Sequence, residues 1–319
     1  MFPLLAVTAA LTLGTAFLVF EAGSHSGRAF AATLAAFAGL VLVMLLFAAA
    51  GMAERTAKIA GPGAGWLLAV LLLLFYLLYG TGSGTLSLPR IGAVALFLFL
   101  PLSLLAAPGP SGSGSWQELL TLTLVWTAVK FGPTHWVWPY PGGRLAYLFT
   151  VVLAVDLVLA GFLLLRRVQG VGYQIGWGSG WGLYVLGALA GFALIAIPLG
   201  IHIGFIAFAP RFGEWKSFLP LAVGILFFTA WPEELLFRGL LQNLASRMLG
   251  ETAGWIAASL LFGLSHITNQ GFPNWRYVLL ASIAGLFYGW TWRKTGSLSA
   301  SALVHAGVDV LWHFLFRTP

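Results

Sequence analysis

The chain contains no cysteine and little charge, and each of these absences excludes a class of protein. Without cysteine there is no disulfide framework, no thiolate metal site and no cysteine nucleophile. Of the 319 residues, 8% are charged and 60% are hydrophobic, against roughly 25% and 45–50% in ordinary soluble domains. So few charges cannot cover the surface of a soluble globule of this size. Most of the exterior must face lipid, and we predict a multi-pass integral membrane protein.

The net charge of +7 does not indicate nucleic-acid binding, because lysine and arginine occur singly or in pairs between apolar runs and never form a stripe. Such placement is typical of loops at a membrane surface, where basic side chains orient helices and contact anionic headgroups. We therefore predict the lipid bilayer as a partner, and no nucleic acid. In a prokaryote the membrane would be the plasma or inner membrane.

Long apolar runs recur along the whole chain. A bilayer core of about 30 Å needs roughly 20 apolar helical residues. Candidate segments lie near 1–20, 29–52, 65–80, 91–107, 116–131, 145–165, 181–206, 218–246, 252–268, 275–293 and 297–316. The first has no basic n-region and is predicted to be a membrane helix rather than a cleaved signal peptide. Segment 116–131 is short and contains Glu118 and Lys130, so a spanning and a re-entrant or interfacial arrangement both stay open. The predicted fold is all-α, a polytopic transmembrane bundle of about nine to eleven helices.

Two breaks suggest a domain organisation. An uncharged Pro/Gly/Ser run occupies 108–115, and a glycine-rich break occupies 166–180. We predict an N-terminal transmembrane block of unknown role at 1–115. An interfacial or re-entrant segment with a linker helix follows at 116–179. Residues 180–319 are predicted to form a catalytic helix bundle, with the active site among the last four helices.

Ionisable side chains at membrane depth cost a few kcal/mol each, so each one is a candidate functional residue. Asp156 and His202 stand alone among apolar neighbours. For these two a structural role is favoured, in which the acid bonds a neighbouring helix.

The C-terminal part differs, because its polar residues come as spaced sets on consecutive apolar segments. The first set holds Glu233, Glu234 and Arg238. Glu234 and Arg238 are four residues apart in the favourable acid-before-base order, so they can neutralise each other on one helix face. Glu233 is turned from Glu234 by about 100°. Glu233 is therefore expected to face a cavity, where a carboxylate can act as a general base.

The second and third sets supply imidazoles. Phe262 and His266 share one helix face, as do His305 and Asp309, and His313 extends the latter face. Histidine and carboxylate ligands suit zinc, with one carboxylate left to activate the metal-bound water. Each pair alone also fits a structural role, but their concentration in one window favours a hydrolytic site. Nearby glycines would allow close helix approach, namely Gly239, Gly263 and Gly307.

The three sets in this order resemble the CAAX prenyl endopeptidase and bacteriocin-processing (CPBP) family of intramembrane proteases, also called the ABI domain. The family pattern is Glu-Glu-x3-Arg, then Phe-x3-His, then His-x3-Asn or Asp, and the resemblance covers roughly residues 180–316. It implies an intramembrane endopeptidase that hydrolyses peptide bonds of membrane-associated or C-terminally lipidated peptides. Its partner would be a peptide or protein substrate in the membrane.

The resemblance also implies roles for individual residues. Glu233 and His266 would activate water, and His305 and Asp309 would hold the oxyanion or a metal. The supporting residues would be Glu234, Arg238 and Phe262. Family members have been described both as metalloproteases and as glutamate-type proteases. A Zn²⁺ ion on His266 and His305, with Glu233 or Asp309, is therefore left open.

Two alternatives to the protease remain. The chain could be a catalytically silent membrane scaffold or bacteriocin-immunity protein, although its complete motifs argue against this. It could instead be an ion-coupled transporter with intramembrane acids and histidines as a relay, although the sequence shows no internal repeat. Geometry separates these alternatives, since a protease needs its carboxylates and imidazoles around one cavity and a relay strings them along the membrane normal.

Overall fold

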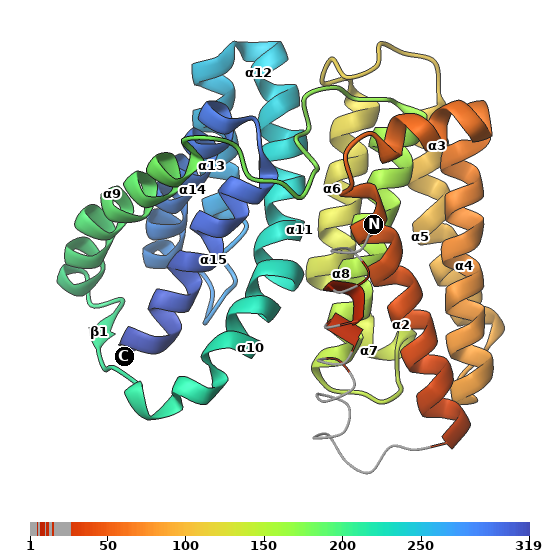
Figure 1. Cartoon of the computed structure of the whole chain (residues 1–319), viewed down its shortest axis with the longest axis horizontal. Coiled ribbons are helices and arrows are strands. Elements are labelled where there is room, and N and C mark those ends of the chain that lie inside the picture. The colour runs from red at the N-terminus through yellow and green to blue at the C-terminus, as the bar shows by residue number, and fades with distance from the viewer. Residues whose placement is uncertain (1–4, 6, 10, 13–14, 16–26) are drawn as a thin grey trace. The chain divides into compact units, whose positions relative to one another are not determined.

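A computed structural model describes residues 5, 7–9, 11–12, 15 and 27–319 (Figure 1). Within this part of the chain, seven helices are long and apolar enough to cross a membrane: Gly27–Phe47, Met52–Ser83, Leu88–Ala106, Arg144–Leu165, Trp181–His202, Lys216–Leu249 and Leu298–Leu315. The protein is an all-α, multi-pass integral membrane protein, as predicted.

Three further helices complete the correspondence with the predicted segments. They are α6 (Trp116–Phe131), α13 (Glu251–Leu264) and α14 (Trp275–Thr295). Every predicted segment from 29–52 onward is therefore helical, although boundaries shift by a few residues. The predicted first helix, 1–20, lies largely outside the described residues.

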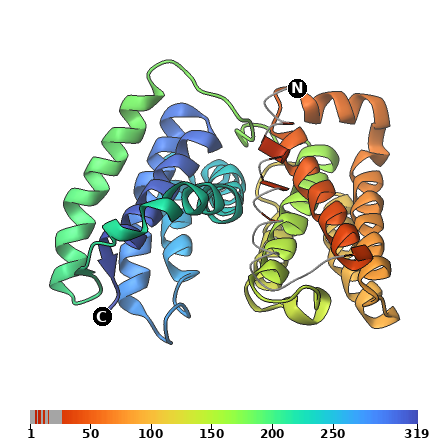
Figure 2. The ribbon, with the colours of Figure 1, turned by 60° about the horizontal axis from the view of Figure 1, so that its bottom comes forward.

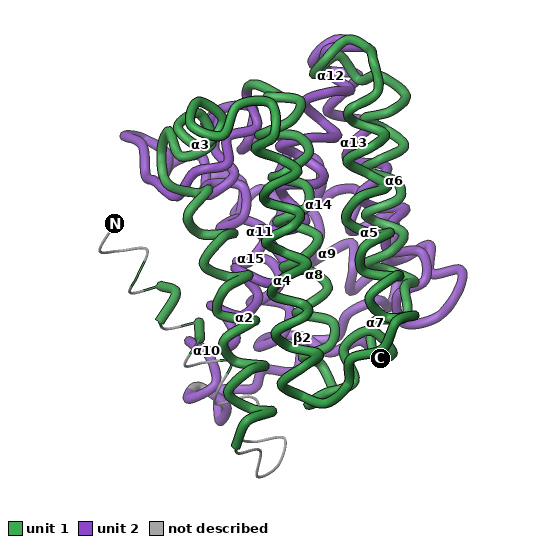
Figure 3. Tube along the Cα trace, turned by 90° about the vertical axis from the view of Figure 1, so that its right-hand side faces the viewer, with its two compact units in different colours: residues 1–169 green, residues 170–319 purple. Residues whose placement is uncertain are grey.

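The chain divides into two compact units, 1–169 and 170–319, which Figure 3 colours separately. Unit 1 contains α2 (Gly27–Phe47), α3 (Met52–Ala60), η1 (Gly61–Gly63), α4 (Ala64–Ser83), α5 (Leu88–Ala106), α6, α7 (Thr134–Val137), α8 (Arg144–Val158) and the π-helical η2 (Leu159–Leu165). Its core holds a cluster of buried aromatic side chains, namely Phe37, Tyr76, Tyr79, Trp138 and Phe149. The division into 1–115, 116–179 and 180–319 stays a prediction.

The Pro/Gly/Ser run at 108–115 is folded into unit 1. The carboxylate of Glu118 accepts backbone N–H groups from Gly114 and Ser115 at 2.9 and 3.0 Å. Arg166 donates to the carbonyl oxygens of Gly109 and Ala107 at 3.0 and 3.2 Å. Ser115 and Glu118 also form a capping box, which explains why α6 begins at residue 116. The run that was predicted as a boundary is thus a loop held by two charged side chains.

The two isolated ionisable residues have contrasting environments. Asp156 lies in α8 and is fully buried, and neither of its carboxylate oxygens has a hydrogen-bond partner in the described part of the chain. The prediction that this acid bonds a neighbouring helix was wrong. His202 is the exposed last residue of α9 (Trp181–His202).

Unit 2 is a second helical bundle. After α9 it contains β1 (Ala207–Phe208), η3 (Phe212–Glu214), α10 (Trp215–Ile225), η4 (Leu226–Ala230), α11 (Trp231–Glu234), η5 (Leu235–Gln242), α12 (Asn243–Leu249), α13, α14, α15 (Leu298–Leu315) and β2 (Phe316–Arg317). From α10 to α12 the chain is one continuous helical run, and η4 and η5 are its π-helical stretches. Helix α9 packs against α14 and α15, and Figure 2 shows it running beside them.

Contacts at both ends fix the position of α15. Gly296 has a positive φ of 64° and ends α14, and the Ser297 side chain caps α15 by accepting the Ala300 N–H. At its other end, β2 pairs antiparallel with β1. These contacts hold α15, which carries the third motif, at both ends.

The segment 170–174, where unit 2 begins, packs against the start of α15. Its Gly172 carbonyl accepts the Leu298 N–H at 3.1 Å, and its Gln174 carbonyl accepts the Ser299 hydroxyl at 2.6 Å. The Val171 carbonyl accepts the Trp292 indole N–H at 3.3 Å. The start of α15 is therefore held by backbone acceptors that lie about 125 residues earlier in the chain.

Candidate active site

The three predicted sets come together in unit 2. Glu233 and Glu234 lie in α11, Arg238 in η5, Phe262 in α13, and His305 and Asp309 in α15. Helix α13 ends at Leu264, so His266 lies in the turn after the helix and not on the helix as the segment 252–268 had implied. The two π-helical stretches flank α11, a feature that is frequent at functional sites.

Glu234 is the buried anchor of the site. Its Oε1 atom lies 3.1 Å from Arg238 Nη1 and 2.9 Å from His305 Nδ1. Its Oε2 atom accepts the hydroxyl of Ser301, which also contacts the Tyr288 carbonyl at 2.9 Å. Both oxygens are thus engaged by groups from two other elements, and Glu234 ties η5 and α15 to α11.

Arg238 is also buried and is enclosed by aromatic rings. Its Nη2 atom donates to the Gly285 carbonyl at 3.2 Å. The guanidinium lies 4.3 Å from the centre of the Phe262 ring and 5.2 Å from that of Tyr288. Ring faces attract cations, so these contacts add to the ion pair with Glu234. Phe262 of the second motif therefore packs directly on Arg238 of the first.

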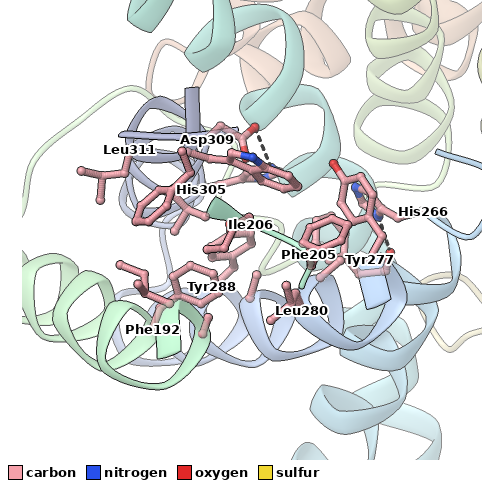
Figure 4. Close-up of a pocket in the computed structure, with 18 of the residues that line it drawn as sticks. Phe192, Phe205, Ile206, His266, Tyr277, Leu280, Tyr288, His305, Asp309 and Leu311 are labelled. Atoms are coloured by element: carbon pink, nitrogen blue, oxygen red, sulfur yellow. Dashed lines mark hydrogen bonds and ion pairs between the residues drawn. The ribbon is translucent and has the colours of Figure 1, made fainter. Parts of the chain in front are cut away.

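A cavity of about 200 Å³ lies beside this anchor. Its polar lining includes Glu233, His266, His305 and Asp309. In Figure 4, His266 and Tyr277 lie together on one side of the cavity, and His305 and Asp309 lie on another. The Nε2 atom of His305 lies 3.6 Å from Asp309 Oδ2 and 3.9 Å from Glu233 Oε2. Two neighbouring glutamates thus have different surroundings, with Glu234 held in the protein and Glu233 at the cavity.

Hydrogen-bond partners indicate which nitrogen of each imidazole carries hydrogen. His305 Nδ1 faces a carboxylate of Glu234, and His266 Nδ1 lies 2.8 Å from the Phe262 carbonyl oxygen. Both partners can accept but not donate, so each Nδ1 is the donor. This leaves Nε2 of each ring for other interactions. Both rings belong to the cavity lining, where Nε2 can meet a water or a substrate.

A zinc ion needs at least three side-chain ligands that converge on one point. Within the described residues, no group of three or more His, Asp or Glu side chains is arranged to hold a metal ion. Zinc requires ligand distances of about 2.0–2.2 Å to nitrogen and oxygen. In their present positions the described side chains of this site do not fit a metal ion.

Several residues at the site were not predicted from the sequence. Tyr288 stacks on His305 with ring centres 4.6 Å apart, and Tyr277 lies 4.9 Å from His266. Asn269 also lines the cavity. Ser301 precedes His305 by four residues, so the spacing 301, 305, 309 was a readable signal of one helix face. His313, at the next step of this spacing, contacts Phe314 and lies outside the cavity lining of the described chain.

The three glycines near the motifs do allow close approach. A Cβ atom on Gly239 would lie 2.9 Å from Val171 Cγ1, and one on Gly307 would lie 2.9 Å from a methyl group of Leu189. A Cβ on Gly263 would clash with Ser282 and lie 2.6 Å from the Val278 carbonyl oxygen. The predicted close helix contacts are confirmed for Gly263, against α14, and for Gly307, against α9, whereas Gly239 lies closest to the non-helical segment 170–174.

Comparison with known proteins gives a family for this part of the chain. Residues 215–311 match the family model described as type II CAAX prenyl endopeptidase Rce1-like. This segment holds all three motifs, so the resemblance to CPBP proteases is confirmed for it. Protein DETOXIFICATION 21 of Arabidopsis thaliana is 34% identical over 111 residues, which cover 32% of this chain and 22% of that protein. The chain thus spans less than a quarter of that protein. No solved structure matches the chain.

Proposed function

We propose that unit 2 is an intramembrane endopeptidase that cleaves peptide bonds in membrane-associated or C-terminally lipidated peptides. The Rce1-like match of residues 215–311 supports a protease. The observation that carries the proposal is the pair of adjacent glutamates, of which Glu234 anchors His305 while Glu233 lines the cavity with His266. Glu233, His305 and Asp309 line one cavity, and His305 Nε2 lies within 4 Å of a carboxylate oxygen of each acid. This convergence supports hydrolysis over a relay along the membrane normal.

The first chemical step needs a base and an oriented water. Glu233 accepts a proton from water as the water oxygen bonds to the substrate carbonyl carbon. The Nε2 lone pair of His266 accepts the second water proton as a hydrogen bond and orients the nucleophile. As the C–O bond forms, the carbonyl π electrons move to oxygen and produce an oxyanion. Such general-base catalysis contributes typically 10²–10⁴-fold.

The second step breaks the amide. The oxyanion collapses to re-form the carbonyl, the C–N bond breaks, and the leaving amine takes the proton that Glu233 carries. His305 holds its Nε2 toward the cavity, because Glu234 fixes Nδ1. Asp309, when ionised, can only accept hydrogen bonds. It therefore supports a positive charge on His305, whose Nε2–H then stabilises the oxyanion.

The proposal is tested by cleavage assays on purified protein in detergent. A panel of membrane-embedded and C-terminally prenylated peptides is incubated with wild type, Glu233→Gln and His266→Ala, with and without a chelator. We expect cleavage by wild type and a loss of about 10²-fold or more with Glu233→Gln. Glu214→Gln is the matched control, because Glu214 is exposed and lies outside the cavity lining.

Each arm has a defined meaning. Cleavage that persists in Glu233→Gln would contradict the assigned base. Loss of activity with chelator, restored by Zn²⁺, would favour a metal-dependent mechanism over the water mechanism above. Inactivity of wild type on the whole panel would favour a catalytically silent scaffold.

A further inference from the structure

The cavity lining contains two carboxylates that accept hydrogen bonds, so an oxyanion formed there needs side chains that donate them. Glu233 and Asp309 both line the cavity beside His305. Glu233 carries a proton once the oxyanion has formed, but the Asp309 carboxylate still repels the oxyanion unless hydrogen-bond donors point at it. Such donors make one of the largest contributions to acyl-transfer catalysis. His305 Nε2 supplies one donor. A second donor must come from another side chain of the lining.

Tyr277 meets this need by its position. Its ring lies 4.9 Å from the His266 ring, and it packs against Phe205 at 5.3 Å and Trp312 at 5.4 Å. Tyr277 lines the same cavity as Glu233 and Asp309, and in Figure 4 it lies beside His266. The aromatic contacts fix the ring, and a fixed donor costs little reorganisation during the reaction.

Asn269 orients this hydroxyl. Its side chain lines the cavity together with Tyr277 and interacts with the Tyr277 hydroxyl. With the amide N–H donating to the phenolic oxygen, the O–H proton of Tyr277 remains available for another acceptor. A donor that itself accepts a hydrogen bond is polarised and becomes a stronger donor.

The loop that carries Asn269 is tied to the helix that carries Tyr277. The Asn269 N–H donates to the His266 carbonyl at 2.9 Å, and its own carbonyl accepts Asn274 Nδ2 at 3.0 Å. Asn274 caps α14 by accepting the Tyr277 N–H at 3.1 Å. Gln270, next to Asn269, adopts a left-handed φ of 57°, a conformation that non-glycine residues adopt mainly where the surroundings impose it. His266, Asn269 and Tyr277 are thus presented to the cavity by one bonded loop.

We propose that Tyr277 is a catalytic residue whose hydroxyl donates a hydrogen bond to the oxyanion, and that Asn269 is the residue that positions it. The proposal rests on the proposed function. No proton or electron is transferred by Tyr277. Its O–H bond stays intact while the carbonyl oxygen gains charge and then loses it as the C–N bond breaks.

The test is the kinetics of Tyr277→Phe on a peptide that wild type cleaves. This variant keeps the ring contacts and removes one hydroxyl. We expect kcat to fall by about 10²–10³-fold with KM unchanged, as for other single oxyanion donors. Tyr184→Phe is the matched control, because Tyr184 packs on Trp290 at 5.6 Å and lies outside the cavity lining. Its kcat should equal that of wild type.

Two further measurements separate catalysis from structure. Asn269→Ala should lower kcat less than Tyr277→Phe, and the double variant should be no slower than Tyr277→Phe alone, because Asn269 acts through the hydroxyl. A phosphinic peptide, which mimics the tetrahedral oxyanion, should bind Tyr277→Phe more weakly by the same factor as the loss in kcat/KM. Thermal unfolding of each variant reports whether it is folded.

The outcomes distinguish this inference from the proposed function. If wild type cleaves, Glu233→Gln does not, and Tyr277→Phe keeps the wild-type kcat, the assignment of Tyr277 is overturned and the protease stands. Independent, additive effects of the two substitutions would overturn the role of Asn269. A wild type that cleaves no peptide, or a Glu233→Gln variant that cleaves normally, overturns both.

Discussion

His305 is oriented by Glu234 and not by the glutamate at the cavity. Its Nδ1 atom lies 2.9 Å from Glu234 Oε1, and its Nε2 atom lies 3.9 Å from Glu233 Oε2. The first distance is a hydrogen bond and the second is not. One carboxylate can therefore change its protonation during a reaction while the other holds the imidazole ring in place.

Ser301 should matter for this orientation. The Ser301→Ala substitution removes a donor from the buried Glu234 carboxylate and leaves an oxygen with one partner fewer. Hydrogen bonds to charged groups contribute about 1.5–3 kcal/mol. We expect a loss of stability of that order in thermal unfolding, together with reduced kcat. Ser259→Ala is the control, because Ser259 bonds the Trp255 carbonyl within its own helix. Equal effects from both substitutions would contradict the special role of Ser301.

Arg238→Met should be among the most destabilising substitutions in unit 2. It leaves the fully buried Glu234 without its ion-pair partner, and breaking a buried pair costs about 3–5 kcal/mol. The double substitution Glu234→Gln with Arg238→Met removes both charges, so it should recover part of that loss. The free energy of unfolding in detergent measures both. A double variant less stable than Arg238→Met would show that the charge pair is not the cause.

The packing of α13 on α14 predicts a steric effect at one glycine. Gly263→Ala would place a methyl group against Ser282 and the Val278 carbonyl. Overpacking of this kind costs about 1–3 kcal/mol. Gly187→Ala, within α9, has open space around it and should be neutral or stabilising by about 0.5–1 kcal/mol, because alanine favours helix. Thermal unfolding of the two variants should move in opposite directions. The same direction for both would contradict the packing argument.

Asp156 gives a prediction of opposite sign. A buried polar group without a partner costs about 1–3 kcal/mol on mutational scales, and Asp156 has no hydrogen-bond partner within the described residues. Asp156→Leu should leave thermal stability unchanged or raise it, and peptide cleavage should be unaffected. Asp156→Asn keeps the shape with a polar group and should gain less. A destabilised or inactive Asp156→Leu variant would show that this acid has a role in unit 1.

Sequence patterns could predict the helices and the motif contacts for clear physical reasons. Apolar runs must become helices in lipid, because only helices satisfy their own backbone groups there. The i,i+4 rule correctly paired Glu234 with Arg238, since that contact is local. The bond between Glu234 and His305 spans 71 residues, and no local rule reports it.

The fold of the 108–115 run and the cavity residues Tyr277 and Asn269 could not be predicted, because they depend on contacts that sequence spacing does not report. The 108–115 run was predicted as a boundary because Pro, Gly and Ser favour loops, yet side chains of Glu118 and Arg166 bond to its backbone and hold it in unit 1. Tyr277 and Asn269 belong to no spaced set. They reach the cavity because of the loop after α13, whose path depends on Asn274 and on the left-handed Gln270.

The stretch 170–174 decides where unit 2 could be cut for use in a fusion protein. Its carbonyl groups receive the Leu298 amide, the Ser299 hydroxyl and the Trp292 indole. A fusion protein cut at the start of α9 would discard these acceptors. It would leave three donors without their partners, one in α14 and two in the first turn of α15, where Ser301 contacts Glu234. A chimera that carries its graft from Gly170 would keep them. Residues 170–174 therefore help to hold the start of α15, the helix that carries His305.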